Sequence, residues 1–170
     1  MSEQDENTTI ETDQVINFDT RIENRELAVE LVSQAKHALR ILTPDLEAPL
    51  YDDASFIEVV TQLITRSRHS KVHILVKDSS QAIIHGHRLI ELSRKFSSYV
   101  HLHNPSKEDS NFLNAFIIAD ESSYLYRQHA SRNEGAVNFH DPLRARELRE
   151  TFDELWKRSR PDPEMRRLYI

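Results

Sequence analysis

The sequence predicts a single α/β domain in which helices cover both faces of a mixed, mostly parallel sheet. Segments whose apolar residues recur with the helical period alternate with short strand-like segments. The runs "ILV" at 74–76 and "FIIA" at 116–119 are continuously apolar, which is typical of buried central strands. Two strand-like segments meet tightly near residue 120 and predict one local antiparallel pair.

Each element is predicted from its local pattern. Apolar residues three or four positions apart mark the helices, and alternating or continuous apolar runs mark the strands. Pro44 and Pro105 end two strands, and Asp53 or Ser55 provides the cap of the second helix. In chain order we expect a helix over 23–38, a strand over 39–43, a loop over 45–53, a helix that includes 56–64, a strand over 71–77, a helix over 79–98, strands over 99–105, 115–120 and 122–128, a loop over 132–142 with room for a short strand, and a helix over 143–159.

Charge divides the chain of 170 residues into a tail and a body. Residues 1–20 hold six acidic residues and no Lys or Arg, which predicts a disordered acidic tail. Residues 21–170 carry 22 acidic and 22 basic residues, so the body is neutral. We expect one domain over 21–160 and a C-terminal tail over 161–170. A neutral body argues against general, charge-driven binding of nucleic acid.

Several classes of protein are excluded by composition. The only glycines are Gly86 and Gly135, so neither a P-loop nor a dinucleotide-binding loop can be built. The absence of cysteine excludes disulfides, thiol catalysis and Cys-based metal sites. No apolar stretch is long enough to span a membrane, and the first residues lack the pattern of a signal peptide. We therefore expect a cytoplasmic protein.

Five stretches together resemble the phospholipase D superfamily. "FIEVVTQLITRSRHSKVHILVKDS" is similar to its helix and following strand, "FIIAD" to its catalytic strand, and "ELRETFDELWKRS" to its closing helix. "GHRLIELSRKFSSYVHLHNP" and "DPEMRRLYI" resemble an uncharacterised bacterial subgroup of small members without the catalytic motif. The resemblance covers about residues 38–160 and implies one phospholipase D-like half-domain.

The resemblance also implies which residues should perform catalysis, and these are missing. Active members carry H-x-K-x(4)-D, in which the His attacks phosphorus and the Lys binds its oxygens. If Asp120 is the motif aspartate, Leu113 stands at the His position and Ala115 at the Lys position. No His or Lys occurs from 108 to 128, so a shift of one residue restores neither group. Leucine cannot attack phosphorus, and the usual reaction is therefore not expected.

Other side chains offer a candidate binding crevice, because ligands of parallel sheets bind at the carboxyl ends of the strands. Arg88, Arg127 and Arg132 have the fork geometry that binds phosphate or carboxylate. In the alternative interpretation the acids cap helices and the arginines form ion pairs, with Arg127 joined to Asp120 or Glu134. The candidate residues are Asp45, Asp78, His85, His87, Arg88, His103, Asp120, Arg127, Arg132 and Glu134.

No metal or other cofactor is expected. His85 and His87 lie two apart in a predicted helix, about 200° around its axis, and cannot easily share a metal. His101 and His103 share one face of a strand, but no nearby pair of acids completes a ligand set.

The sequence favours a non-catalytic binding or protein-interaction module, and two other functions stay open. A phosphodiesterase-like or other phosphate-ester enzyme would use non-standard residues of the crevice, such as His85, His87 and Arg127. A local nucleic-acid-binding adaptor would use an arginine patch, which the neutral body disfavours. The expected partner is a protein or a small anionic ligand, with a homodimer as a further option and no membrane partner.

Overall fold

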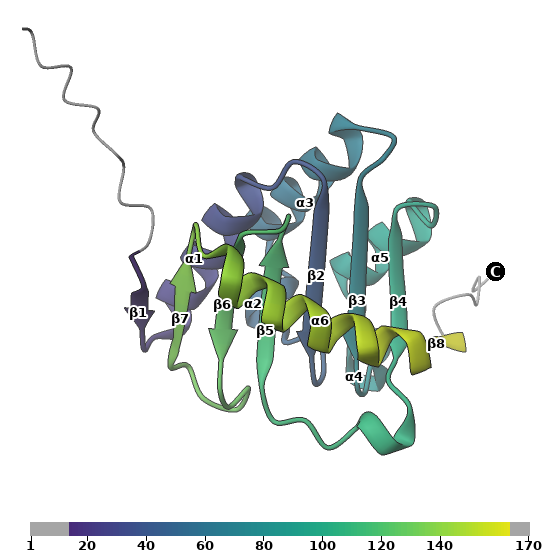
Figure 1. Ribbon diagram of the computed structural model, residues 1–170. Helices are drawn as coiled ribbons and strands as arrows, with labels where there is room; N and C mark the ends of the chain where they lie inside the picture. Colours follow the sequence, from purple (N-terminus) through teal and green to yellow (C-terminus); the bar gives the residue numbers. More distant parts are fainter. Residues whose placement is uncertain (1–13, 164–170) are drawn as a thin grey trace, which may run out of the picture.

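The computed structural model describes residues 14–163, which form one eight-stranded sheet with helices on both faces (Figure 1). The strand order is β1-β7-β6-β5-β2-β3-β4-β8. The strands are β1 (Ile16–Phe18), β2 (Ala38–Thr43), β3 (Lys71–Val76), β4 (Val100–Asn104), β5 (Ala115–Ala119), β6 (Ser123–Arg127), β7 (Gly135–Asn138) and β8 (Arg160–Pro161).

The prediction of a mostly parallel sheet is wrong. Only β2–β3 and β3–β4 are parallel, and the other five strand pairs of the described chain are antiparallel. Helices connect β2 to β3 and β3 to β4, as parallel pairing requires. A loop with a single 3-10 turn, Lys107–Asp109, connects β4 to β5, and β5 then lies antiparallel beside β2.

The helices agree with the sequence pattern in place and differ in extent. The predicted helix over 23–38 is α1, which ends at Ser33, because Ala38 already belongs to β2. The predicted helix over 79–98 is divided at Gly86, whose φ of +71° is left-handed. The expected loop over 45–53 contains a short helix. The helices are α1 (Arg21–Ser33), α2 (Ala48–Tyr51), α3 (Ala54–Arg66), α4 (Ser80–His85), α5 (Arg88–Lys95) and α6 (Pro142–Arg158).

Two apolar cores lie on opposite faces of the sheet. The larger core packs α1, α3 and α5 against one face and includes Leu31, Phe56 and Leu89, each fully buried. The smaller core lies under α6, which crosses the other face alone (Figure 1). Phe116 and Phe152 are its largest fully buried side chains. No helix in residues 14–163 has the length and apolar character that crossing a membrane requires.

The two ends of the described chain form the edge strands. β1 lies within the predicted tail of residues 1–20, pairs with β7, and places Phe18 beside Gly135. A Cβ on Gly135 would lie 2.4 Å from Phe18 Cζ, so only glycine allows this close approach. β8 lies at the start of the predicted C-terminal tail and pairs with β4. Residues 1–13 and 164–170 lie outside the described residues, and disorder there stays a prediction.

Candidate functional site

The loop after β2 holds a strained residue in a fixed position. Leu46 has φ +59°, a left-handed conformation that costs a branched side chain energy. Leu46 is held by the burial of its side chain and by two hydrogen bonds. Its N–H donates to Thr43 Oγ1 at 3.2 Å, and its carbonyl accepts from His87 Nε2 at 2.8 Å. The conformation of Leu46 thereby fixes Asp45 and Glu47 on either side of it.

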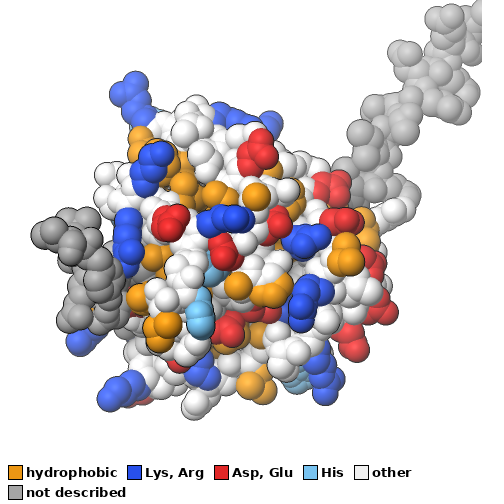
Figure 2. Space-filling view, turned by 180° about the vertical axis from the view of Figure 1, so that it is seen from behind, with side chains coloured by type: hydrophobic (Ala, Val, Ile, Leu, Met, Phe, Trp, Pro, Cys, Tyr) orange, Lys and Arg blue, Asp and Glu red, His pale blue; other side chains and the backbone are white. Residues whose placement is uncertain are grey.

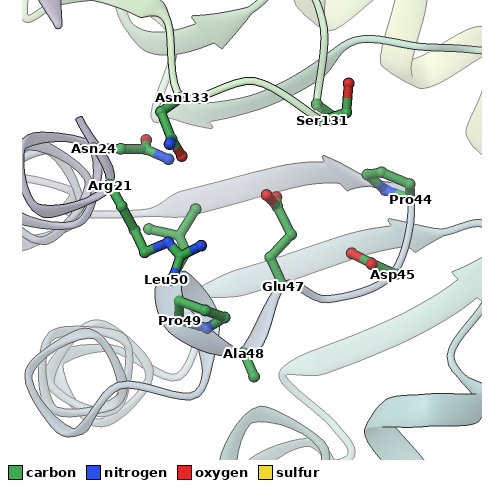
Figure 3. Close-up of a pocket in the computed structure, with 11 residues that line it drawn as sticks. Arg21, Asn24, Pro44, Asp45, Glu47, Ala48, Pro49, Leu50, Ser131 and Asn133 are labelled. Atoms are coloured by element: carbon green, nitrogen blue, oxygen red, sulfur yellow. The ribbon is translucent and has the colours of Figure 1, made fainter. Parts of the chain in front are cut away.

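A pocket of about 440 Å³ opens beside this loop, at the carboxyl end of β2 (Figure 3). Arg21 and Asn24 extend into it from α1, while Asp45 and Glu47 come from the loop after β2 (Figure 3). The 128–134 segment after β6 closes a third side. The lining residues are Arg21, Asn24, Pro44, Asp45, Glu47, Ala48, Pro49, Leu50, Ala130, Ser131 and Asn133.

Asn24 is an unusual buried residue of this pocket. Its side chain is only 3% exposed, yet Oδ1 has no hydrogen-bond partner within residues 14–163. An unpaired buried polar atom costs about 1–3 kcal/mol, so most such atoms in native proteins have a partner. Asn24 therefore has one buried acceptor without a partner in the described chain, on a residue that lines the pocket.

A largely buried ion pair joins Glu47, which lines the pocket, to Arg127, which lies behind it. Arg127 is 2% exposed and donates to the carboxylate of Glu47, to Ala130 O at 2.8 Å and to Arg132 O at 3.2 Å. It therefore pairs with neither Asp120 nor Glu134, the two partners considered from the sequence. Burial, with the Glu47 carboxylate nearby, raises the pKa of Tyr51 and keeps this buried phenol neutral.

The structure separates Asp120 from the candidate crevice. Because β5 is antiparallel to β2, the carboxyl end of β5 lies beside the amino end of β2, away from the carboxyl end of β2 where the pocket opens. The Asp120 carboxylate accepts hydrogen bonds from the backbone N–H groups of Lys36, His37 and Ala38, at 2.8–3.2 Å. It fixes the turn that leads into β2, which is a structural task.

The two residues that the resemblance places at the His and Lys positions of the motif lie at the pocket end of β5. Ala115 is fully buried and pairs in register with Arg127 on β6. Leu113 is 68% exposed, and its carbonyl accepts from Ala130 N at 2.7 Å. The place expected for a nucleophile and its cation therefore carries two aliphatic side chains beside an arginine that Glu47 already neutralises.

Three further candidate residues, Asp78, His85 and Arg88, have structural contacts at this end of the sheet. Asp78 accepts from Ser80 N at 3.0 Å, and its hydrogen bonds with Ser80 lower its pKa. His85 contacts Gln81 on its own helix at 3.2 Å. Arg88 is joined to Asp52 through its backbone N–H at 2.9 Å and its Nε at 3.9 Å.

His87 is a buried cap, and its protonation state follows from its two contacts. Nε2 donates to the Leu46 carbonyl, and Nδ1 accepts from Leu89 N at 3.1 Å. Only the neutral ring provides one donor and one acceptor. Burial lowers the pKa of His87, in agreement with a neutral ring.

His103 belongs to an aromatic cluster under α6. Its ring stacks on Trp156 at 3.9 Å between centroids, and Trp156 stacks on His73 at 4.2 Å. His103 Nδ1 also contacts Ser159 Oγ at 2.8 Å. Burial, then the neighbouring His101 and Arg40, lower the pKa of His73 to about 4. The cluster holds α6 on the sheet and lies outside the pocket.

A second pocket, of about 470 Å³, lies on the far side of the 128–134 segment. It contains Arg132 and Glu134 from the candidate set, together with His129. Of the ten candidates, only Asp45 lines the first pocket, while Arg127 contacts its lining residue Glu47. Arg132 and Glu134 line the second pocket.

Sequence reasoning missed several residues of the first pocket: Arg21, Asn24, Glu47, Ser131 and Asn133. Asn24 offered one signal, because its amide interrupts the apolar side of an otherwise amphipathic helix. A polar cluster also lies at the carboxyl ends of β3 and β4. There buried Asp162 accepts from Ser79 Oγ and from Asn104 Nδ2, and this contact fastens the segment after β8.

Residues 20–168 match the model of a protein family described as "Domain of unknown function (DUF7931)". The match covers most of the chain, so the chain belongs to this family. No curated protein matches the sequence.

Solved structures share the fold at low sequence identity. Nuc from Salmonella typhimurium, a phospholipase D family member, matches with TM-score 0.62 and 16% identity over 88% of this chain and 97% of its own. NucT from Helicobacter pylori matches with TM-score 0.59 and 11% identity over 88% of this chain and 99% of its own. TrmBL2, an archaeal chromatin protein, matches with TM-score 0.64 and 14% identity over 91% of this chain and 56% of its own. This chain therefore spans about half the length of TrmBL2. The fold is therefore phospholipase D-like.

Proposed function

We propose that the chain is a phospholipase D-like domain that has lost catalysis and works as a binding module through the first pocket. The proposal is supported by Leu113 and Ala115, which the sequence resemblance places at the positions of the nucleophile and its cation. Ala115 is buried, and no histidine or lysine among residues 14–163 lines the 440 Å³ pocket. Neither side chain can attack phosphorus or stabilise a phosphorane.

The surrounding charges support the same conclusion. Arg127, the cation beside Ala115, donates to Glu47 and to two carbonyls, so its charge is already compensated. A catalytic cation must be able to stabilise charge that develops in the transition state. Arg127 instead holds the 128–134 segment in place, which is what a preformed binding site needs.

Hydrolysis of bis(p-nitrophenyl) phosphate tests the loss of catalysis. We expect no release of nitrophenolate above the buffer rate at any protein concentration. A rate proportional to protein concentration, lost in a variant of one pocket residue that still folds, would show an enzyme and overturn the proposal.

One observation favours an enzymatic alternative, and the assay includes it. His129 and Arg132 line the second pocket with Glu134, and histidine beside arginine is a combination that phosphate-ester enzymes use. His129→Ala removes the imidazole of this pocket, and His85→Ala removes an exposed imidazole that lines neither pocket. Activity that falls only in His129→Ala would assign the reaction to the second pocket.

Nucleic-acid binding is the remaining alternative. TrmBL2 is described as a chromatin protein with a novel mode of DNA binding. In this chain basic and acidic side chains are interspersed over the face that carries α1, α3 and α5 (Figure 2). Residues 21–170 are also neutral. We expect no salt-dependent binding to duplex DNA, and a logarithmic affinity that falls linearly with logarithmic salt concentration would support the adaptor function instead.

A further inference from the structure

The first pocket has charge of opposite sign at its two ends. Arg21 lies in the first turn of α1, where the helix dipole adds positive potential, and has no acidic partner within 4.0 Å among residues 14–163. Asp45 lies on the loop after β2 and forms no ion pair in the same part of the chain. Glu47, the other acid of the pocket, pairs with Arg127. The uncompensated charges are therefore one cation on the α1 side and one anion on the loop side (Figure 3).

Asn24 is the second and independent observation. Asn24 lines the pocket, and its buried Oδ1 has no hydrogen-bond partner in the described chain. A ligand with an N–H or O–H group would satisfy this acceptor. A pocket of about 440 Å³ has the size of typical small-molecule sites.

We propose that the pocket binds a small zwitterion of the amino-acid type, with its carboxylate on Arg21, its ammonium group on Asp45 and one N–H or O–H group on Asn24. This inference rests on the proposed function, because it names the ligand class of the same pocket. The strained conformation of Leu46 keeps Asp45 in place before a ligand arrives, so little ordering is needed on binding.

Isothermal titration of the full chain with single L-amino acids tests the proposal. We expect at least one amino acid to bind, and its N-acetyl and methyl-ester derivatives to bind at least tenfold more weakly, since each lacks one of the two charges. Binding of none of the amino acids, or equal binding of a blocked derivative, overturns the inference.

Two charge variants then assign each end of the ligand. Arg21→Ala should weaken the amino acid at least tenfold and leave the affinity of the methyl ester unchanged, because that ester has no carboxylate. Asp45→Asn should weaken the amino acid and leave the N-acetyl derivative unchanged. Arg68→Ala and Glu58→Gln, exposed residues outside the pocket, are matched controls. Equal losses in pocket and control variants contradict the assignment.

Asn24→Leu separates a ligand contact from a merely unpaired group. Leucine has the same number and branching of side-chain heavy atoms and removes the unpaired acceptor, so the ligand-free variant should melt at or above the wild-type temperature while binding is lost. Unchanged binding in a folded variant contradicts the role of Asn24. A protein that binds no amino acid and hydrolyses no phosphodiester refutes only the zwitterion. Hydrolysis of bis(p-nitrophenyl) phosphate refutes the proposed function itself.

Discussion

Asp120 should contribute to the stability of the fold rather than to catalysis. The size of this contribution to the free energy of unfolding follows from its hydrogen bonds. Three backbone N–H groups donate to its carboxylate, at residues 36, 37 and 38. These groups lie near solvent, so water replaces part of each lost hydrogen bond, and about 1 kcal/mol for each is appropriate. Alanine at φ +53° adds about 1 kcal/mol of backbone strain. Asp120→Ala should therefore lower the free energy of unfolding by about 4 kcal/mol.

Urea unfolding followed by tryptophan fluorescence measures this loss. For a domain of this size, the melting temperature should fall by roughly 10 °C. Asp120→Asn tolerates the left-handed backbone and keeps one acceptor oxygen, so we expect about half the loss. Glu121→Ala is the matched control, because its side chain is 87% exposed, and should stay within about 0.5 kcal/mol of wild type. A loss below about 1 kcal/mol in Asp120→Ala would refute the structural role.

Three further changes have defined outcomes. Arg127→Met leaves the Glu47 carboxylate without its buried partner and should lower the free energy of unfolding in urea by about 3–5 kcal/mol. The double variant with Glu47→Gln should recover part of this loss. A loss below about 1 kcal/mol in Arg127→Met would contradict the pairing. Gly135→Ala forces a Cβ against Phe18 and should cost about 1–3 kcal/mol, so wild-type thermal unfolding would disprove the contact. The pKa of His73 is about 4 in the folded protein, below its value of about 6.5 in the unfolded chain. Between these values the unfolded chain binds the extra proton, so the free energy of unfolding falls as the pH drops from 6.5 to 4. His73→Phe should flatten this pH dependence, and an unchanged slope would reject the assignment.

The sequence carried most of the fold, because each central strand has its own local signal. The apolar runs of β3 and β5 and the alternating residues of β4 appear within one or two residues of their predicted places. Strand direction was misjudged, because it depends on how β5 returns to β2, and a loop leaves no periodic pattern. β1 was missed, since three residues beside a long acidic stretch are too short a signal.

The site was less predictable, because it depends on which loops meet in space. The places of Asp45 and Arg127 at strand ends identify both residues. Asp45 lines the first pocket, and Arg127 pairs with its lining residue Glu47. Asn24 and Glu47 could not be identified from the sequence. No local pattern shows that the amide of a helix residue is buried, or that an acid in a loop pairs with an arginine 80 residues away. Placing Asp120 in the crevice requires β5 to run parallel to β2. β5 is antiparallel to β2, so its carboxyl end lies at the opposite end of the sheet.

The lone helix α6 sets the order in which the domain can be completed. During synthesis from the amino terminus, β2 to β7 leave the ribosome before α6 does. Leu42, Leu75 and Phe116 then form an apolar surface without its cover. Only when α6 arrives can this surface be shielded from other nascent chains, so a ribosome that pauses between β7 and α6 holds a sheet prone to aggregation.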